Sequence, residues 1–185
     1  MIADAPTPTD EALAAALAQG DDDALNTLMT RWQIPLRAFL YRMLQNEHDA
    51  LELSQDTFVR IYRKRESYRE GARFSTWMFQ IALNLARDHC RRRTRRPTDS
   101  LDDVPELSGD DNPGSDALAT ERILTVRAAI AELPEDLRAA LIFSEYDDNS
   151  HAEIAAIVGA TSKAVETRLY RARELLRKKL AKFMA

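Results

Sequence analysis

The chain has 185 residues, of which 45% are apolar and 30% charged, and its formal net charge at pH 7 is −4. Its single cysteine, Cys90, excludes an internal disulfide and fits the reducing cytoplasm, and no apolar stretch is long enough for membrane insertion. Cys90 stands beside His89 without the further ligands that a metal site needs, and the net charge taken alone argues against nucleic-acid binding.

An all-α fold is predicted, because alanine, leucine and arginine are far more frequent than isoleucine and valine. The first helix is short and covers Asp10–Gln19. The second covers Asp22–Leu44, where apolar residues at a three-four spacing continue past Pro35, so that we expect a kink and not an end. The third covers His48–Ser67.

A loop and a fourth helix follow, and both carry many arginines. Gly71 marks a loop over Tyr68–Phe74, and Ser75 is the candidate N-cap of a helix that runs into an arginine-rich end at 91–96. Residues 60–96 hold twelve basic and three acidic side chains with aromatic residues between them. This pattern favours single-stranded nucleic acid, where bases stack on rings and phosphates meet cations. The alternative is that the rings, which have helical spacing around Trp77, belong to the core.

An acidic linker is predicted to follow over residues 97–115. Residues 97–120 hold seven acidic side chains and no basic one, together with prolines and glycines, so this part of the chain buries too little apolar surface to order itself. It divides the chain into a domain at 10–96 and a domain at 116–183. With a flexible linker, we expect the basic surfaces of the two domains to have no fixed separation.

Four helices are expected after the linker, and the last two form a helix-turn-helix. They cover Ala117–Glu132, Glu135–Tyr146, Ala152–Val158 and a long stretch from Ser162 to Phe183. A glycine at position 159 suits the tight turn, and Thr161 suits the N-cap of the last helix. The fold predicted is thus two small helical domains joined by a flexible acidic linker, with a C-terminal helix-turn-helix.

The last helix has an apolar stripe and an opposite polar face. Val165, Leu169, Ala172 and Leu176 form the stripe, which we expect to face the core. The polar face suits base edges in the major groove, and other basic residues suit phosphates. An ordinary basic surface helix is the alternative. The candidates for bases are Lys163, Glu166, Thr167, Tyr170 and Arg171, and those for phosphates are Arg168, Arg173, Arg177, Lys178 and Lys179.

Several segments of the chain resemble those of a known family. Asp49–Tyr62 resembles the polymerase-binding helix of extracytoplasmic-function sigma factors, in the sigma-70 family, and Ala72–Ala82 resembles their promoter-melting segment. The C-terminal domain resembles their fourth conserved region at Leu133-Pro134, Glu153–Ala155, Gly159, Ala164–Leu169 and Arg171–Arg173. Together these segments follow the family's order and spacing from about residue 10 to residue 183.

The resemblance implies a sigma factor that binds core RNA polymerase, recognises promoter DNA and promotes transcription initiation. Its polymerase contacts would be the beta-prime clamp and the beta flap, and family members are commonly held inactive by an anti-sigma factor. The acidity of the implied clamp-binding helix fits a basic partner surface. The implied polymerase-binding residues are Asp49, Glu52, Gln55, Asp56 and Phe58.

The resemblance also implies two DNA sites. Single-stranded DNA of the minus-ten element would be bound by Tyr68, Arg69, Arg73, Phe74, Trp77, Arg87, Arg91 and Arg92. Duplex DNA of the minus-thirty-five element would be read by Thr161, Ser162, Lys163, Glu166, Thr167, Arg168, Tyr170 and Arg171. Many relatives carry a basic residue where this chain has Glu166. The carboxylate of Glu166 can instead accept a hydrogen bond from the amine of a cytosine.

Two other classes of function fit parts of the sequence. A helix-turn-helix regulator that acts without being a polymerase subunit would explain the C-terminal domain but not the aromatic and basic stretch at 60–96. A helical scaffold would make both basic segments solvated faces. Nothing in the sequence favours an enzyme or a cofactor, because there is no phosphate-binding glycine loop and no catalytic or metal-binding set with usable spacing.

Overall fold

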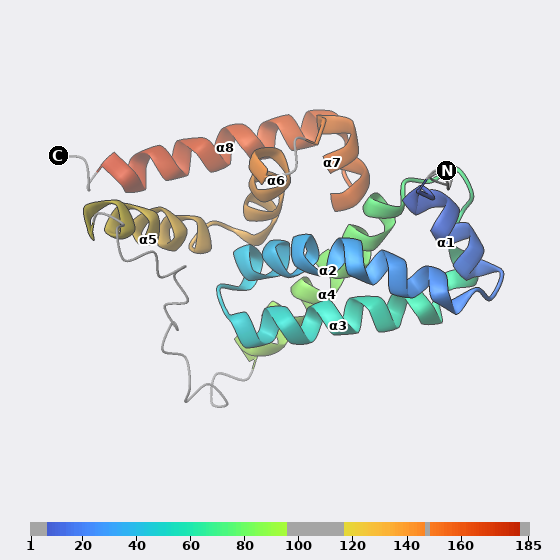
Figure 1. The fold of residues 1–185 in the computed structure, drawn as a ribbon. Coiled ribbons are helices and arrows are strands. Elements are labelled where there is room, and N and C mark those ends of the chain that lie inside the picture. Colours follow the sequence, from blue (N-terminus) through green and yellow to red (C-terminus); the bar gives the residue numbers. More distant parts are fainter. Residues whose placement is uncertain (1–6, 96–116, 147–148, 182–185) are drawn as a thin grey trace, which may run out of the picture.

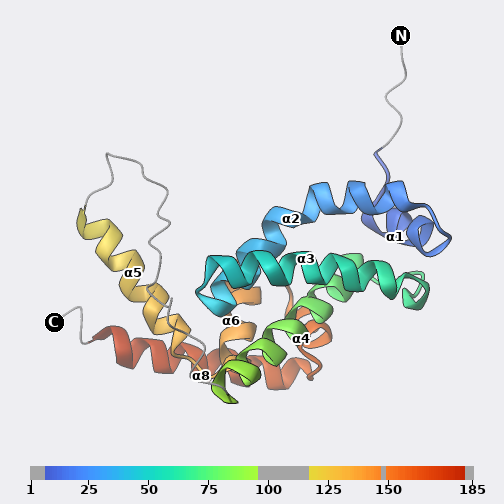
Figure 2. The same ribbon diagram turned by 90° about the horizontal axis from the view of Figure 1, so that it is seen from below.

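The computed structural model describes residues 7–95, 117–146 and 149–181, and within these ranges the secondary structure is entirely helical. The all-α prediction is confirmed. The predicted linker, residues 97–115, lies outside the described residues. Figures 1 and 2 show an N-terminal bundle with the C-terminal helices along one side of it.

The N-terminal bundle contains four α-helices and a 3₁₀ turn. Local caps start the first three helices: Thr9 Oγ1 accepts from the Ala12 amide, Asp21 from the Asp23 amide and Asn46 from the Asp49 amide. Pro35 lies inside the second helix without ending it, as predicted. The elements are α1 (Asp10–Ala18), α2 (Asp22–Leu44), α3 (Glu47–Arg63), η1 (Arg65–Ser67) and α4 (Phe74–Arg95).

Two predicted boundaries in this bundle are wrong. The third helix ends at Arg63, and a 3₁₀ turn replaces the last turn predicted for it. Ser75 is not an N-cap, because α4 already begins at Phe74. The Phe74 amide donates to the carboxylate of Glu11, a residue of α1, at 3.3 Å. The start of α4 is therefore capped by another helix and not by a neighbour in sequence.

The C-terminal part contains four helices, α5 (Ala117–Ala131), α6 (Glu135–Tyr146), α7 (His151–Val158) and α8 (Ser162–Leu180). A capping box between Ser150 and Glu153 starts α7, which ends at Gly159 with a positive φ of 66°. Thr161 Oγ1 then accepts from the Ala164 amide and starts α8. The helix-turn-helix prediction is confirmed, including its glycine turn and its cap.

The two parts of the chain share one apolar core. The Phe143 ring of α6 stacks on Phe39 of α2 with centroids 4.6 Å apart, and it meets the edge of Phe79 of α4 at 5.3 Å. Arg138 Nη1 donates to the Met43 carbonyl at 2.6 Å, and Gln80 Nε2 donates to the Ala156 carbonyl at 2.8 Å. Figure 1 shows α6 and α7 next to the bundle and α8 farther from it. The expectation that the two basic surfaces have no fixed separation is wrong for this conformation, because buried rings join the two parts.

Candidate nucleic-acid interface

The acidic side of α3 is an exposed surface at helical spacing. Glu52, Gln55 and Asp56 are exposed, and their i, i+3 and i+4 positions put them on one face. Asp49, one turn earlier, is largely buried, and its Oδ2 lies 3.1 Å from Nε2 of His89 on α4. Glu52, Gln55 and Asp56 are therefore accessible to a partner. Asp49 instead connects α3 to α4 through its ion pair with His89.

Phe58 does not belong to this face. Its ring is 4% exposed and packs in the core, apart from the exposed residues of this face, and its polymerase contact stays a prediction. Three apolar residues of α3, Leu51, Val59 and Tyr62, are exposed. Val59 lies one turn beyond Asp56 on the same face, a position that the spacing from Glu52 could have revealed.

The loop between η1 and α4 presents arginines and buries its aromatic residues. Arg69 and Arg73 are exposed. Tyr68 is 9% exposed and its hydroxyl donates to the Ala72 carbonyl within the same loop, while Phe74 is fully buried. Tyr68 and Phe74 thus contribute to the packing of the loop, and their contact with DNA stays a prediction. Trp77 remains half-buried between them, with ring centroids 5.2 and 6.3 Å away.

The arginines of α4 differ in what surrounds them. Arg91 and Arg92 are exposed near the end of the helix. Arg87 is only 19% exposed, with Nε 3.0 Å from Glu135 Oε1 and Nη2 2.8 Å from Asp136 Oδ1. A cation predicted to hold DNA phosphate is thus held by two carboxylates at the start of α6.

The predicted reading face of α8 is exposed, and of its predicted core stripe three residues are buried while Leu176 is half-buried. Val165, Leu169 and Ala172 are at most 2% exposed. Lys163 Nζ donates to Glu166 at 2.8 Å, and this bond holds the pKa of the Glu166 carboxyl below its usual value, so that Glu166 remains an acceptor. The exposed predicted residues are Thr161, Ser162, Lys163, Glu166, Thr167, Tyr170 and Arg171.

Arg168 is the exception on α8. It is 25% exposed, and its Nη2 lies 3.3 Å from Asp136 Oδ2. Asp136 therefore binds one arginine from α4 and one from α8, and together with Glu135 it forms what we call the acidic pair. The acidic pair thus occupies the guanidinium groups of both Arg87 and Arg168. Arg73 makes a comparable ion pair with Glu153 of α7.

The described parts of the chain hold neither a metal-binding cluster nor a membrane-spanning helix. No group of three or more His, Cys, Asp and Glu side chains there is placed to hold a metal ion, and no helix there is long and apolar enough to cross a membrane. Cys90 is half-buried. Burial raises the pKa of its thiol above the usual value and Glu135 adds to the rise, so the thiolate form is disfavoured.

Comparison with known families and proteins covers most of the chain. Residues 28–96 match the family model described as Sigma-70 region 2, and residues 123–176 match the one described as Sigma-70, region 4. The chain is 32% identical to the RNA polymerase sigma-H factor of Pseudomonas aeruginosa, with 92% of this chain and 93% of that protein covered. It is 32% identical to the ECF RNA polymerase sigma-E factor of Haemophilus influenzae, with 95% and 97% covered.

Two solved structures share the arrangement of helices. CnrH in complex with the cytosolic domain of CnrY matches with a TM-score of 0.71 at 27% identity, covering 94% of this chain and 97% of that one. The sigma factor RpoE of Bartonella quintana, in complex with the anti-sigma factor NepR, matches with a TM-score of 0.68 at 25% identity, covering 84% and 96%.

Proposed function

Since this chain belongs to the extracytoplasmic-function sigma factors of the sigma-70 family, we propose that each of its two parts has the role of the family region that it matches. Residues 10–96 form the domain that binds core polymerase and the minus-ten element. Residues 116–183 form the domain that reads the minus-thirty-five element, and residues 97–115 link the two. As an RNA polymerase sigma factor, the protein binds core RNA polymerase, recognises promoter DNA and promotes transcription initiation.

The observation that carries the assignment of the DNA-reading domain is the face of α8. An N-capped helix follows a glycine turn and presents Lys163, Glu166, Thr167 and Arg171 to solvent, while its opposite stripe is buried. These side chains pair with base edges in the major groove. A run-off transcription assay tests the function as a whole: core enzyme with this chain is expected to start at sites that core enzyme alone does not use.

The minus-ten site proposed here consists of exposed cations around one half-buried ring. Arg69 and Arg73 lie in the loop before α4, and Trp77 in the first turn of α4 offers a half-buried indole next to Tyr68 and Phe74. Bases stack on such a ring, and the cations meet phosphates. Arg87, Arg91 and Arg92 of α4 would continue this path along the strand. Opening of the promoter is driven by this binding, without a chemical step in the subunit, and so we propose no enzymatic activity.

DNA binding in this scheme requires the acidic pair to release its arginines. Arg87 and Arg168 are bound to Glu135 and Asp136, and a phosphate cannot reach them until those ion pairs open. The pairs are partly exposed, so each contributes at most about 1 kcal/mol, an amount that binding to a larger partner can offset. We propose that association with core polymerase separates the two domains and frees both arginines.

Neutralising the acidic pair is expected to raise the affinity of the free protein for DNA. In Glu135→Gln with Asp136→Asn, three ion-pair contacts lose their charge, and affinity for duplex promoter DNA without polymerase should rise about five- to thirtyfold, equivalent to 1–2 kcal/mol. Fluorescence anisotropy measures the affinity, and small-angle scattering should show a larger radius of gyration. Asp22→Asn with Asp23→Asn changes the net charge equally at an exposed site of α2. Equal gains in both double variants would contradict release of the arginines.

Arg171→Ala is expected to weaken binding to one promoter sequence in particular. Loss of an arginine that reads a base should cost about 1–3 kcal/mol of promoter affinity and relax the preference at one base pair. Binding to a series of duplexes, each changed at one position of the minus-thirty-five element, measures both effects. Arg173→Ala serves as the phosphate-type comparison and should weaken all duplexes alike. If Arg171→Ala also weakens specific and random DNA alike, Arg171 is not a reading residue.

The proposed partners include a protein inhibitor, and the proposed location is the cytoplasm. One neighbouring solved structure is a sigma factor bound to an anti-sigma factor, and this supports an anti-sigma partner for this chain too. The targets of the protein, core polymerase and promoter DNA, lie in the cytoplasm, and its half-buried single thiol is compatible with that compartment.

A further inference from the structure

The N-terminal helix α1 contacts the two elements that flank the loop proposed to bind the minus-ten strand. It contacts η1, which precedes that loop, and α4, which follows it. Glu11 of α1 accepts the Phe74 amide at the start of α4, and this amide has no acceptor within its own helix, as is general for a first turn. The loop of residues 68–73 is thus held from both ends by a helix that precedes it by about fifty residues in the sequence.

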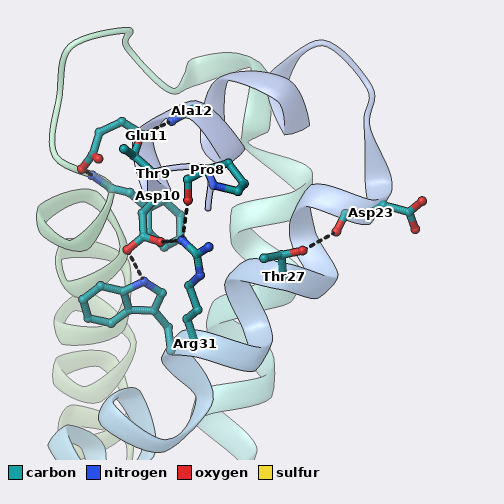
Figure 3. A network of polar contacts seen from close by, with 10 residues as sticks. Pro8, Thr9, Asp10, Glu11, Ala12, Asp23, Thr27 and Arg31 are labelled. Carbon is teal, nitrogen blue, oxygen red and sulfur yellow. Dashed lines mark hydrogen bonds and ion pairs between the residues drawn. The ribbon is translucent and has the colours of Figure 1, made fainter. Parts of the chain in front are cut away.

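A network of polar contacts fixes α1 itself. Asp10 accepts from Arg31 Nη1 at 2.6 Å and from the Trp32 indole at 2.8 Å, and Arg31 also donates to the Pro8 carbonyl (Figure 3). The centroid of the Trp32 ring lies 6.4 Å from the centroid of the Phe74 ring. Both acidic residues in the first turn of α1 therefore accept hydrogen bonds near Phe74, where α4 begins. Asp10 accepts from Trp32, whose ring lies next to Phe74, and Glu11 accepts from the Phe74 amide itself.

Tyr68, at the start of the loop, is also influenced by the acidic residues of α1. The Tyr68 hydroxyl donates to the Ala72 carbonyl and closes the loop on itself. Burial raises the pKa of Tyr68, and the charges of Glu11 and Asp10 add to the rise, so the hydroxyl stays protonated and able to donate. With Tyr68 and Phe74 buried, the loop leaves Arg69 and Arg73 exposed, and Arg73 also forms an ion pair with Glu153 of α7.

We propose that Glu11 is a positioning residue for minus-ten recognition, because its carboxylate caps α4 from outside and thereby sets the shape of the loop that carries Arg69 and Arg73. The inference rests on the proposed function of that loop. Glu11 touches no DNA in this scheme. The Glu11 carboxylate is an anion beside the proposed DNA-binding surface, so it repels phosphate and lowers the affinity for DNA. The hydrogen bond from the Phe74 amide to this carboxylate has to offset that loss.

The test separates the hydrogen bond of Glu11 from its charge. Glu11→Ala removes both, whereas Glu11→Gln keeps an acceptor oxygen and removes only the charge. Each variant is assembled with core polymerase and measured on two probes from a promoter that the wild-type holoenzyme transcribes: a single strand with the minus-ten element carrying 2-aminopurine, and a duplex with the minus-thirty-five element. Asp22→Ala, at an exposed acid in the first turn of α2, is the matched control.

Loss of the cap should lower the affinity of Glu11→Ala for the single strand about fivefold, the ratio that corresponds to the usual cost of about 1 kcal/mol for a lost helix cap. Glu11→Gln and Asp22→Ala should bind the single strand at least as well as the wild type, and the duplex should be bound equally by all. A fivefold loss in Glu11→Gln as well, or a parallel loss on the duplex, would overturn the inference. Failure of the wild-type holoenzyme to bind the single strand would instead overturn the proposed role of the loop.

Discussion

Asp56→Arg combined with Gln55→Ala is expected to abolish association with core RNA polymerase while the fold stays intact. Both side chains are exposed on α3 beside Glu52, on a face that the described residues do not cover. Breaking a charge pair at a protein interface commonly costs about 2–5 kcal/mol, or roughly thirtyfold to several thousandfold in affinity, and a reversed charge adds repulsion. Co-elution with core enzyme in size-exclusion chromatography measures the association, and circular dichroism measures the fold.

A charge reversal at another exposed acid serves as the control for this experiment. Asp22→Arg changes the net charge of the chain as Asp56→Arg does, but it lies at the start of α2 and not on the proposed polymerase-binding face. It should co-elute like the wild type. Unaltered co-elution of the α3 double variant would exclude this face from the interface, and loss of co-elution in both would point to net charge and not to a specific contact.

Phe143→Ala is expected to lower the free energy of unfolding by about 3–5 kcal/mol. Its ring is fully buried and joins α6 to Phe39 and Phe79 of the N-terminal bundle. Truncation leaves a cavity at the centre of the shared core and removes two ring pairs that are each worth about 0.5–1.5 kcal/mol beyond their buried area. Because a domain of this kind is stable by only about 5–15 kcal/mol, the change is large. Equilibrium unfolding in urea measures it.

Two comparison variants give that measurement its meaning. Phe143→Leu keeps most of the apolar volume and loses the ring pairs, so it should be clearly less destabilised than Phe143→Ala. Val126→Ala, at an exposed position of α5, should stay within about 0.5 kcal/mol of the wild type. A Phe143→Ala midpoint that matched that of Val126→Ala would mean that the two parts are not joined by this ring in solution.

Local patterns in the sequence predicted most elements of the fold. The apolar stripe of α8 at Val165, Leu169 and Ala172 is buried as expected, since helical periodicity alone puts these side chains on one face. Thr161 and Gly159 start and end their helices as predicted, because each acts on backbone groups within a few residues. The exposed face of α8 follows from the same geometry.

Several features that local patterns did not predict involve partners distant in sequence. Ser75 was a reasonable local cap, but Glu11, 63 residues away, supplies the cap of α4. Phe58, Tyr68 and Phe74 have side chains suited both to a core and to a binding surface, and only packing against other helices decided for burial. Arg87 carries its charge in a segment of net positive charge, and nothing local indicated that residues 48 and 49 positions later would bind it.

The sequence by itself determined the eight α-helices of the described chain, the helix-turn-helix and the placement of basic and acidic segments, because these depend on backbone capping and on side-chain periodicity within one or two turns. The tertiary structure alone decided which charges are paired between helices, which rings are buried, and that the two parts of the chain pack together. Those outcomes depend on contacts such as Arg138 with the carbonyl of Met43, 95 residues apart, which the packed core brings together.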